Sequence, residues 1–151
     1  MKYGTLLLAL VCACLGTGSA MADDKAPQMS DILSAQTGQN GRECVRVNDI
    51  RGYGYQDRVL TMDARGGYYV ATTLFRCHDL ESSTAAAFNG TFGEICGGGG
   101  SSVGRRLGRC PIGKVFKFNN RQQAFEALDQ AKQTLSDAGV IQARNLVLTH
   151  Y

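Results

Sequence analysis

Four cysteines constrain the fold of this chain more than any other feature. Two of the six cysteines lie within the first 22 residues, and the others stand at Cys44, Cys77, Cys96 and Cys110. An even set of cysteines in an exported chain predicts two disulfides. The spacing leaves all three pairings open. We prefer the nested one, Cys77 with Cys96 and Cys44 with Cys110, because it ties the first strand to the last.

Export is inferred from the N-terminus. Lys2 precedes an apolar run from Leu6 to Leu15, and small residues follow as far as Ala22. This order is typical of a secretory signal peptide. We therefore expect a signal peptide over residues 1–22, cleaved near Ala22 or two residues earlier, and a mature protein that is periplasmic or secreted. An alternative is a lipoprotein whose acyl chain is attached at Cys14.

The composition limits the classes of partner. Cleavage removes Lys2 and lowers the formal net charge from +3 to +2, which is too mild to indicate a nucleic-acid partner. After the signal peptide, no run approaches the roughly 20 apolar residues of a transmembrane helix, so the mature chain is not expected to span a membrane. Tryptophan is absent and glycine numbers 19, which indicates a thin core and many turns.

Alternating apolar and polar residues predict a β domain over residues 43–118. Residues 23–42 are polar, and we expect them to form a flexible arm with at most a turn of helix. After Cys44, Val45 and Val47 alternate with Arg46 and Asn48, which is typical of a half-buried strand that can extend to Ile50. Further strands are expected over Arg58–Met62 and Tyr68–Leu74, joined by a glycine turn. These three strands would form an antiparallel meander.

The second half of this domain is predicted to be less regular. We expect a loop over residues 81–90, a short strand over Thr91–Cys96 and a flexible glycine-rich hairpin connection over Gly97–Ser102. A last strand is expected over Cys110–Phe118, with Ile112, Phe116 and Phe118 on one face.

The C-terminal region, residues 119–151, has the period of a helix. Asn119 or Asn120 can cap its start, and Gly139 can end it. One face is predicted to carry the apolar residues Phe125, Leu128, Ala131 and Leu135. Val140–Tyr151 can add a strand. The fold class is therefore α+β: a small, mainly antiparallel domain (meander, barrel or sandwich-like) cross-linked by two disulfides, with one C-terminal amphipathic helix.

Part of the chain resembles a known family. The matching residues are Cys44-Val45-Arg46, Ile50-Arg51, Asp57, Gly66-Gly67-Tyr68, Leu74 with Cys77, Leu80, Phe92 with Cys96, and Cys110-Pro111-Ile112-Gly113 with Phe116. This pattern, covering about half of the chain, resembles a family of small exported proteobacterial proteins of unknown function with four spaced cysteines. In that family an Asp often follows the third cysteine closely, whereas four glycines follow Cys96 here. The resemblance implies a compact β-rich fold and implies no activity.

Residues suited to chemistry are sparse. The four cysteines with His78 resemble a zinc ligand set, but no Cys-x-x-Cys pair is present, so we predict neither a metal site nor a cofactor. His78 and His150 lack a nucleophile motif around them, and no catalytic residue is assigned. We therefore expect a non-enzymatic protein. The alternatives are a small periplasmic hydrolase that uses paired carboxylates, and an assembly protein that presents its C-terminal helix.

One basic cluster is the expected contact surface. It contains Arg105, Arg106, Arg109, Lys114 and Lys117, and we assign binding to its three arginines. The expected partner is an anionic surface or an envelope protein. A charged strand edge that prevents aggregation is the other interpretation. Four tyrosines could add a binding face: Tyr53, Tyr55, Tyr68 and Tyr69.

The export prediction is tested by intact mass. We expect the natively exported protein to begin near Asp23, with all four thiols protected from alkylation until a reductant is added. Free thiols would contradict the predicted disulfides, and an acyl mass at Cys14 would support the lipoprotein alternative.

Overall fold

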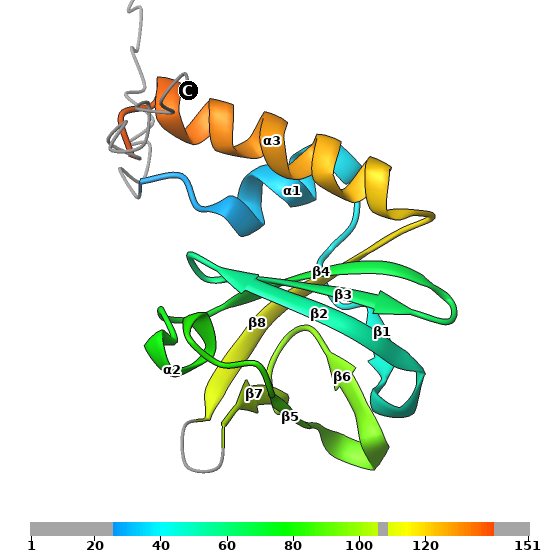
Figure 1. Cartoon of the computed structure of the whole chain (residues 1–151). Coiled ribbons are helices and arrows are strands. Elements are labelled where there is room, and N and C mark those ends of the chain that lie inside the picture. The colour runs from blue at the N-terminus through cyan, green and yellow to red at the C-terminus, as the bar shows by residue number, and fades with distance from the viewer. Residues whose placement is uncertain (1–25, 106–108, 141–151) are drawn as a thin grey trace, which may run out of the picture.

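The computed structural model describes residues 26–105 and 109–140, and these form two layers (Figure 1). Two helices, α1 (Met29–Thr37) and α3 (Arg121–Asp137), pack on each other across one face of a six-stranded sheet. The sheet is antiparallel throughout and curls into a half-barrel around a small two-stranded sheet.

The strand order defines the half-barrel. Across the large sheet the strands are β2 (Ile50–Gln56), β3 (Val59–Ala64), β4 (Gly67–Thr73), β8 (Cys110–Phe118), β7 (Ser102–Gly104) and β5 (Ala87–Asn89). The small sheet pairs β1 (Cys44–Arg46) with β6 (Glu94–Cys96). The short helices are η1 (Val47–Asp49), α2 (His78–Glu81) and η2 (Thr91–Gly93).

The predicted fold class is confirmed, and the predicted meander is displaced. An α+β chain with a mostly antiparallel sheet, a C-terminal helix and two disulfides is what the structure has. The meander is β2-β3-β4, whose first strand begins at Ile50 rather than at Cys44. The single strand expected from Cys44 is interrupted by η1, so β1 leaves the meander and pairs with β6.

Hydrophobic residues fill both faces of the sheet. Inside the half-barrel, Leu60 and Met62 pack with Ile95 of the small sheet. On the other face, Val70 and Phe116 pack against the two helices. Alternate residues of β4 enter the two clusters, which explains why this strand is almost continuously buried.

A bulge in β8 changes the predicted facing of its residues. Thr72 pairs with Lys114 and Thr73 with Ile112, so Gly113 is an extra residue in β8. Such an insertion reverses the alternation of side chains along a strand. Ile112 therefore lies inside the half-barrel, whereas Phe116 faces the helices. The expectation that Ile112 shares a face with Phe116 and Phe118 was wrong for this reason.

The N-terminal arm is more ordered than its sequence suggested. Its described part contains the nine-residue helix α1, where we expected a flexible arm with at most one turn of helix. Leu33 is fully buried against the helical side of the sheet. Gln39 also fixes the segment after the helix, because its side chain bonds both the N–H and the C=O of Lys117 at 2.8 Å. Tertiary contacts thus order a segment that has little helical pattern of its own.

The predicted C-terminal helix is confirmed as α3. Asn120 caps it, with its Oδ1 accepting a hydrogen bond from the N–H of Gln123 at 2.9 Å. Gly139 follows the helix in a left-handed conformation, φ 70°. Leu128 and Leu135 are buried as expected, whereas Phe125 lies at the border of the buried face and remains partly exposed. The strand expected after Val140 lies outside the described residues.

The disulfides pair differently from the preferred nested order. Cys44 bonds Cys96, and Cys77 bonds Cys110. Cys44 and Cys96 lie opposite each other in the β1–β6 ladder, with Cα atoms 4.1 Å apart. The nested pairing assumed that the strand from Cys44 lies beside the last strand, but β1 pairs with β6. In the chain-entropy model, closing loops of 52 and 33 residues stabilises the fold by about 4 kcal/mol each.

The connections between strands also differ from the sequence expectation. The glycine-rich segment is not a hairpin connection, because β6 and β7 belong to different sheets. This segment packs against β8, because the N–H of Gly98 donates a hydrogen bond to the C=O of Gly113 at 2.7 Å. A side chain at Gly97 would collide with the C=O of Gly41. The expected loop over residues 81–90 carries β5, and only residues 94–96 of the expected Thr91–Cys96 strand form β6.

The packing of α1 gives a stability prediction. Leu33→Ala should lower the free energy of unfolding by about 2–5 kcal/mol, because it leaves a cavity in the core. Leu74→Ala is the matched control, since Leu74 is 61% exposed and its loss should cost about 0.5 kcal/mol or less. Denaturant unfolding measures both. Equal effects of the two substitutions would contradict a packed α1.

Candidate binding site

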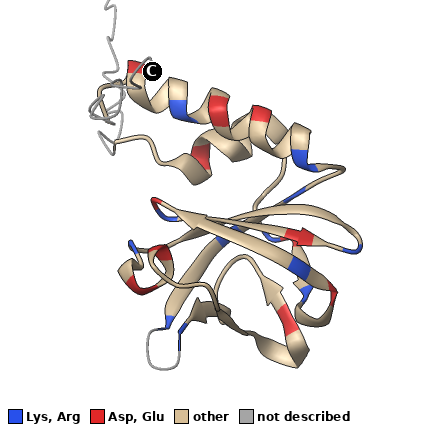
Figure 2. Cartoon of the chain, viewed as in Figure 1, with Lys and Arg blue, Asp and Glu red and all other residues tan. Residues whose placement is uncertain are grey.

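The arginines singled out in the sequence lie around the β7–β8 connection. Arg105 and Arg109 are exposed at its two ends, and Arg106 lies outside the described residues. Figure 2 shows basic residues at both ends of this grey segment. The other members of the basic cluster are separate: Lys114 reaches α1 and binds Asp31 at 3.1 Å. The strand β8 carries the lysines away from Arg105 and Arg109, so the four described residues of the cluster do not form one surface.

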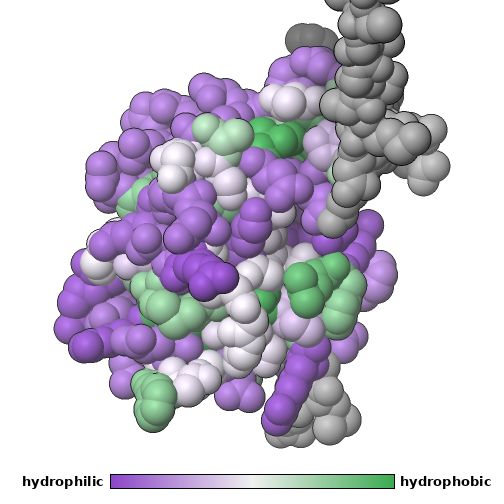
Figure 3. Space-filling view, turned by 180° about the vertical axis from the view of Figure 1, so that it is seen from behind, coloured by the Kyte–Doolittle hydropathy of each residue, from purple (hydrophilic) through white to green (hydrophobic). Residues whose placement is uncertain are grey.

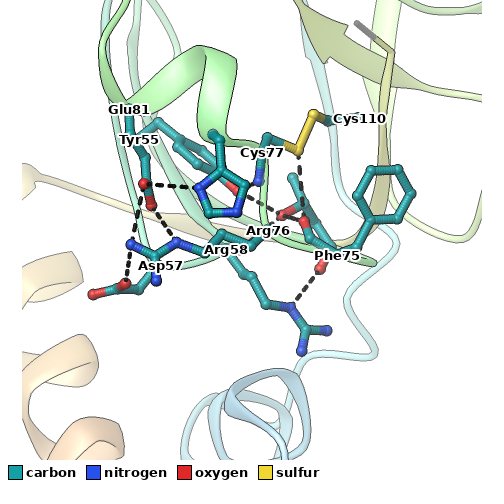
Figure 4. Close-up of polar contacts among 10 residues, drawn as sticks. Tyr55, Asp57, Arg58, Phe75, Arg76, Cys77, Glu81 and Cys110 are labelled. Carbon is teal, nitrogen blue, oxygen red and sulfur yellow. Dashed lines mark hydrogen bonds and ion pairs between the residues drawn. A yellow bond between two sulfur atoms is a disulfide. The ribbon is translucent and has the colours of Figure 1, made fainter.

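A disulfide brings other groups to the Arg109 end of β8. Cys110 begins β8 and bonds Cys77, which lies just before α2; their Cα atoms are 6.1 Å apart. The N–H of Leu74 also bonds the C=O of Pro111 at 3.1 Å. The segment between β4 and α2 is therefore fixed beside Arg109. We call this region, formed by the β2–β3 turn, residues 73–81 and the start of β8, the disulfide corner (Figure 4).

A chain of hydrogen bonds fixes the interior of the disulfide corner. The Tyr55 hydroxyl accepts a bond from the Cys77 N–H at 2.9 Å and lies 3.1 Å from Oγ1 of Thr73. Thr73 in turn donates to the C=O of Phe75 at 2.8 Å. Each hydroxyl thus has a partner, as a part-buried polar group requires. The network holds the backbone of residues 73–77 against β2.

Arg76 pairs with two acidic groups of the corner, Glu81 and Asp57. Its Nε and Nη2 atoms lie 2.8 and 3.1 Å from the two carboxylate oxygens of Glu81, and Nη2 lies 3.4 Å from Asp57. The hydrogen bonds from Arg76, with its charge, hold the pKa of Glu81 below its usual range and raise that of Arg76. His78 adds a longer contact, 3.8 Å from Glu81. Glu81 is therefore best suited to remaining ionised.

Arg58 is held differently. Its Nε donates to the C=O of Thr73 at 3.3 Å, and its Nη2 donates to the C=O of Leu74 at 2.9 Å. Within residues 26–105 and 109–140, no carboxylate forms an ion pair with it. Asp57, its neighbour in sequence, pairs with Arg76 instead. Arg58 is thus a positioned cation whose charge no acidic side chain of the described chain cancels.

The turn that carries Arg58 has an uncommon backbone. Asp57 and Arg58 join β2 to β3 with φ values of 48° and 71°. Two successive left-handed residues are typical of a tight hairpin turn, where Asn-Gly is the favoured sequence. A non-glycine residue pays a conformational penalty there. The bonds from Arg58 to the 73–74 carbonyls, and the one from the Thr73 N–H to the Arg58 C=O at 2.9 Å, hold the turn.

The corner opens onto a groove and an apolar patch. A groove of about 1790 Å³ lies between the helical layer and the sheet, with Arg58 and Leu74 among its lining residues. In Figure 4 the Arg58 guanidinium points away from the disulfide, toward the ribbon of α1. Leu74 and Phe75 are 61% and 51% exposed. Figure 3 shows apolar residues next to hydrophilic ones on the side of the molecule where α2 lies.

Other sequence candidates lie elsewhere. The four tyrosines do not form one binding face: Tyr68 packs under the helices, whereas Tyr53, Tyr55 and Tyr69 pack inside the half-barrel. The sulfurs of Cys44 and Cys96 lie within 4.8 Å of a Glu94 oxygen, but they are joined in a disulfide and offer no thiolate. None of the helices in the described ranges has the length and hydropathy of a membrane span.

Comparisons of the chain with protein-family models, curated proteins and solved structures found no match. The geometry of the corner therefore carries the functional argument. No role of Arg58 is evident from the sequence. A signal was available, since Asp57-Arg58 occupies a two-residue turn without glycine, but its contact with residues 73–74 depends on the fold.

The Arg76–Glu81 pair predicts a pH-dependent contribution to stability. Because the pKa of Glu81 is lowered on folding, the pair stabilises the protein above the ordinary Glu value of about 4.3, and this is lost as the pH falls through the lower folded value. Glu81→Gln should therefore lower the melting temperature slightly at neutral pH and have no effect in strong acid. Glu94→Gln, at another exposed ion pair, is the control. If the difference in melting temperature between Glu81→Gln and the unchanged protein persisted in acid, the stabilising role of the Arg76–Glu81 pair would be contradicted.

Proposed function

We propose that this protein is an exported, non-enzymatic binding protein, periplasmic or secreted. Its disulfide corner binds an anionic group of the partner. The observation that carries this proposal is Arg58, a guanidinium fixed by two backbone carbonyls and without a carboxylate partner among the described residues. A cation that is already positioned needs little reorganisation to accept an anion.

The surroundings of Arg58 support an anionic partner. Arg105 and Arg109 add positive charge near the same end of β8, and Arg106, outside the described residues, belongs to the same proposed contact set. Exposed cations attract anionic partners at long range, and a guanidinium binds carboxylate or phosphate with two hydrogen bonds. Leu74 and Phe75 supply apolar contact area beside these charges. The partner class is therefore an anionic surface or an envelope protein with acidic groups.

Export agrees with the covalent structure. Two disulfides are typical of an oxidising, exported environment. We extend this to a cleaved signal peptide over residues 1–22 and to kinship with the small exported proteobacterial proteins that the cysteine pattern resembles. Intact mass of the native protein tests the first point.

The alternatives receive less support from the same contacts. A hydrolase with paired carboxylates needs one carboxyl group that stays protonated near neutral pH. Asp57 and Glu81 share Arg76, which lowers the pKa of Glu81 and favours the charged form. An assembly protein would need an exposed apolar stripe on α3, but Leu128 and Leu135 face inward.

Charge neutralisation tests the proposal. The variant Arg105→Gln/Arg109→Gln, and the same variant with Arg58→Asn added, should elute from an anionic matrix such as heparin at progressively lower salt, because attraction between exposed charges is screened by ions. The control is Arg51→Gln/Arg65→Gln, which removes the same number of positive charges as the double variant but at positions away from the corner. Equal elution of the corner and control variants would contradict the proposed surface.

A further inference from the structure

Arg58 has a specific set of hydrogen-bond donors that no described residue uses. A guanidinium has five N–H groups in a fixed plane. Arg58 uses the edge formed by Nε and Nη2 to bind the Thr73 and Leu74 carbonyls. The terminal edge, formed by Nη1 and the second N–H of Nη2, has no hydrogen-bond partner among residues 26–105 and 109–140. Two parallel N–H groups on that edge match the two oxygens of one carboxylate.

An apolar side chain lines the same groove as these donors. Leu74, whose carbonyl holds Arg58, is 61% exposed. A Cβ atom on Gly113 would lie only 3.1 Å from Cδ2 of Leu74, so the leucine rests on the bulge of β8. A bound molecule with its carboxylate on Arg58 would thus place its adjoining group against Leu74.

The groove beyond Arg58 has a mixed lining. Its wall on α3 presents Phe125 together with Asp129 and Lys132, and its floor includes Gly54 and Thr61 of the β2–β3 hairpin. A hydrocarbon chain would desolvate these charged groups without compensation, whereas a peptide backbone can hydrogen-bond to them. The volume of about 1790 Å³ also exceeds the roughly 300–1,000 Å³ of a small-molecule pocket. The groove therefore suits an extended peptide better than a lipid chain.

We propose that the groove binds the C-terminal end of an extended peptide, with the terminal carboxylate on Arg58 and an apolar last side chain against Leu74. This inference rests on the proposed function and specifies its partner. Recognition of a chain end by fixed N–H donors is a known mode of peptide binding. The carboxylate fits because Arg58 is charged and lacks an acidic partner among the described residues.

Fluorescence anisotropy with labelled octapeptide pools tests the inference. The pools carry fluorescein at the N-terminus, randomised inner positions and a last residue of Leu or Phe, and each is made as the free acid and as the C-terminal amide. We expect the acid pools to bind about 10- to 100-fold more tightly, the range for a hydrogen bond to a charged group. Pools ending in Gly should bind more weakly than those ending in Leu, and Leu74→Ser should remove that difference.

Variants of Arg58 test whether this residue causes the tighter binding of the free-acid peptides. Arg58→Asn should abolish the preference for the acid, and asparagine tolerates the left-handed backbone at this position. Arg58→Lys, which keeps the charge without the planar edge, should retain only part of it. Arg51→Gln, a change on exposed β2, should leave it intact. A thermal melt of each variant confirms folding.

Several outcomes would overturn the inference. These are equal binding of acid and amide pools, binding of neither pool, an acid preference that survives Arg58→Asn, and displacement of the peptides by dodecanoate with dodecanoate itself binding more tightly. If retention on the anionic matrix still depends on Arg58 together with Arg105 and Arg109 in any of these cases, the proposed function stands and only the peptide assignment fails. If that retention is also absent, both fail.

Discussion

The pairing of β4 with β8 is the interaction on which the rest of the structure depends. These two strands lie at the centre of the large sheet and contribute side chains to both hydrophobic clusters. One face closes the half-barrel over Ile95, and the other receives α1 and α3 through Val70 and Phe116. The chain has no tryptophan to fill a core. Because the sheet is buried on both faces, this single pair of strands contributes side chains to two hydrophobic cores instead.

The disulfide corner follows from this arrangement. β4 ends at Thr73 beside the start of β8, and the Cys77–Cys110 bond fixes the segment between β4 and α2 there. The Tyr55 and Thr73 hydroxyls then hold that segment against β2, so its carbonyls are positioned to receive Arg58. Arg76 takes up the nearby carboxylates, which leaves Arg58 with an uncompensated charge among the described groups. The candidate site is thus assembled from local contacts that depend on the pairing of β4 with β8.

Predictions from sequence succeeded where local chemistry decides the outcome. The Asn120 cap and the inward face of α3 depend on neighbours three or four residues away, and both are as expected except that Phe125 stays partly exposed. The position of β8 was also anticipated from its alternation. The facing of Ile112 was not, because the bulge at Gly113 is visible only when β4 is placed beside it. The order of α1 was missed for a similar reason, since Leu33 is stabilised by residues far away in the sequence.

By itself, the sequence determined the α+β class, the presence of two disulfides and the segment that forms the C-terminal helix, because these depend on composition and short-range periodicity. It also located the cations at residues 105 and 109. Only the tertiary structure decided which cysteines pair, which arginine lacks a described acidic partner and where a groove opens. Those properties depend on which strands lie side by side, and the free energy of that choice comes from contacts between residues widely separated along the chain.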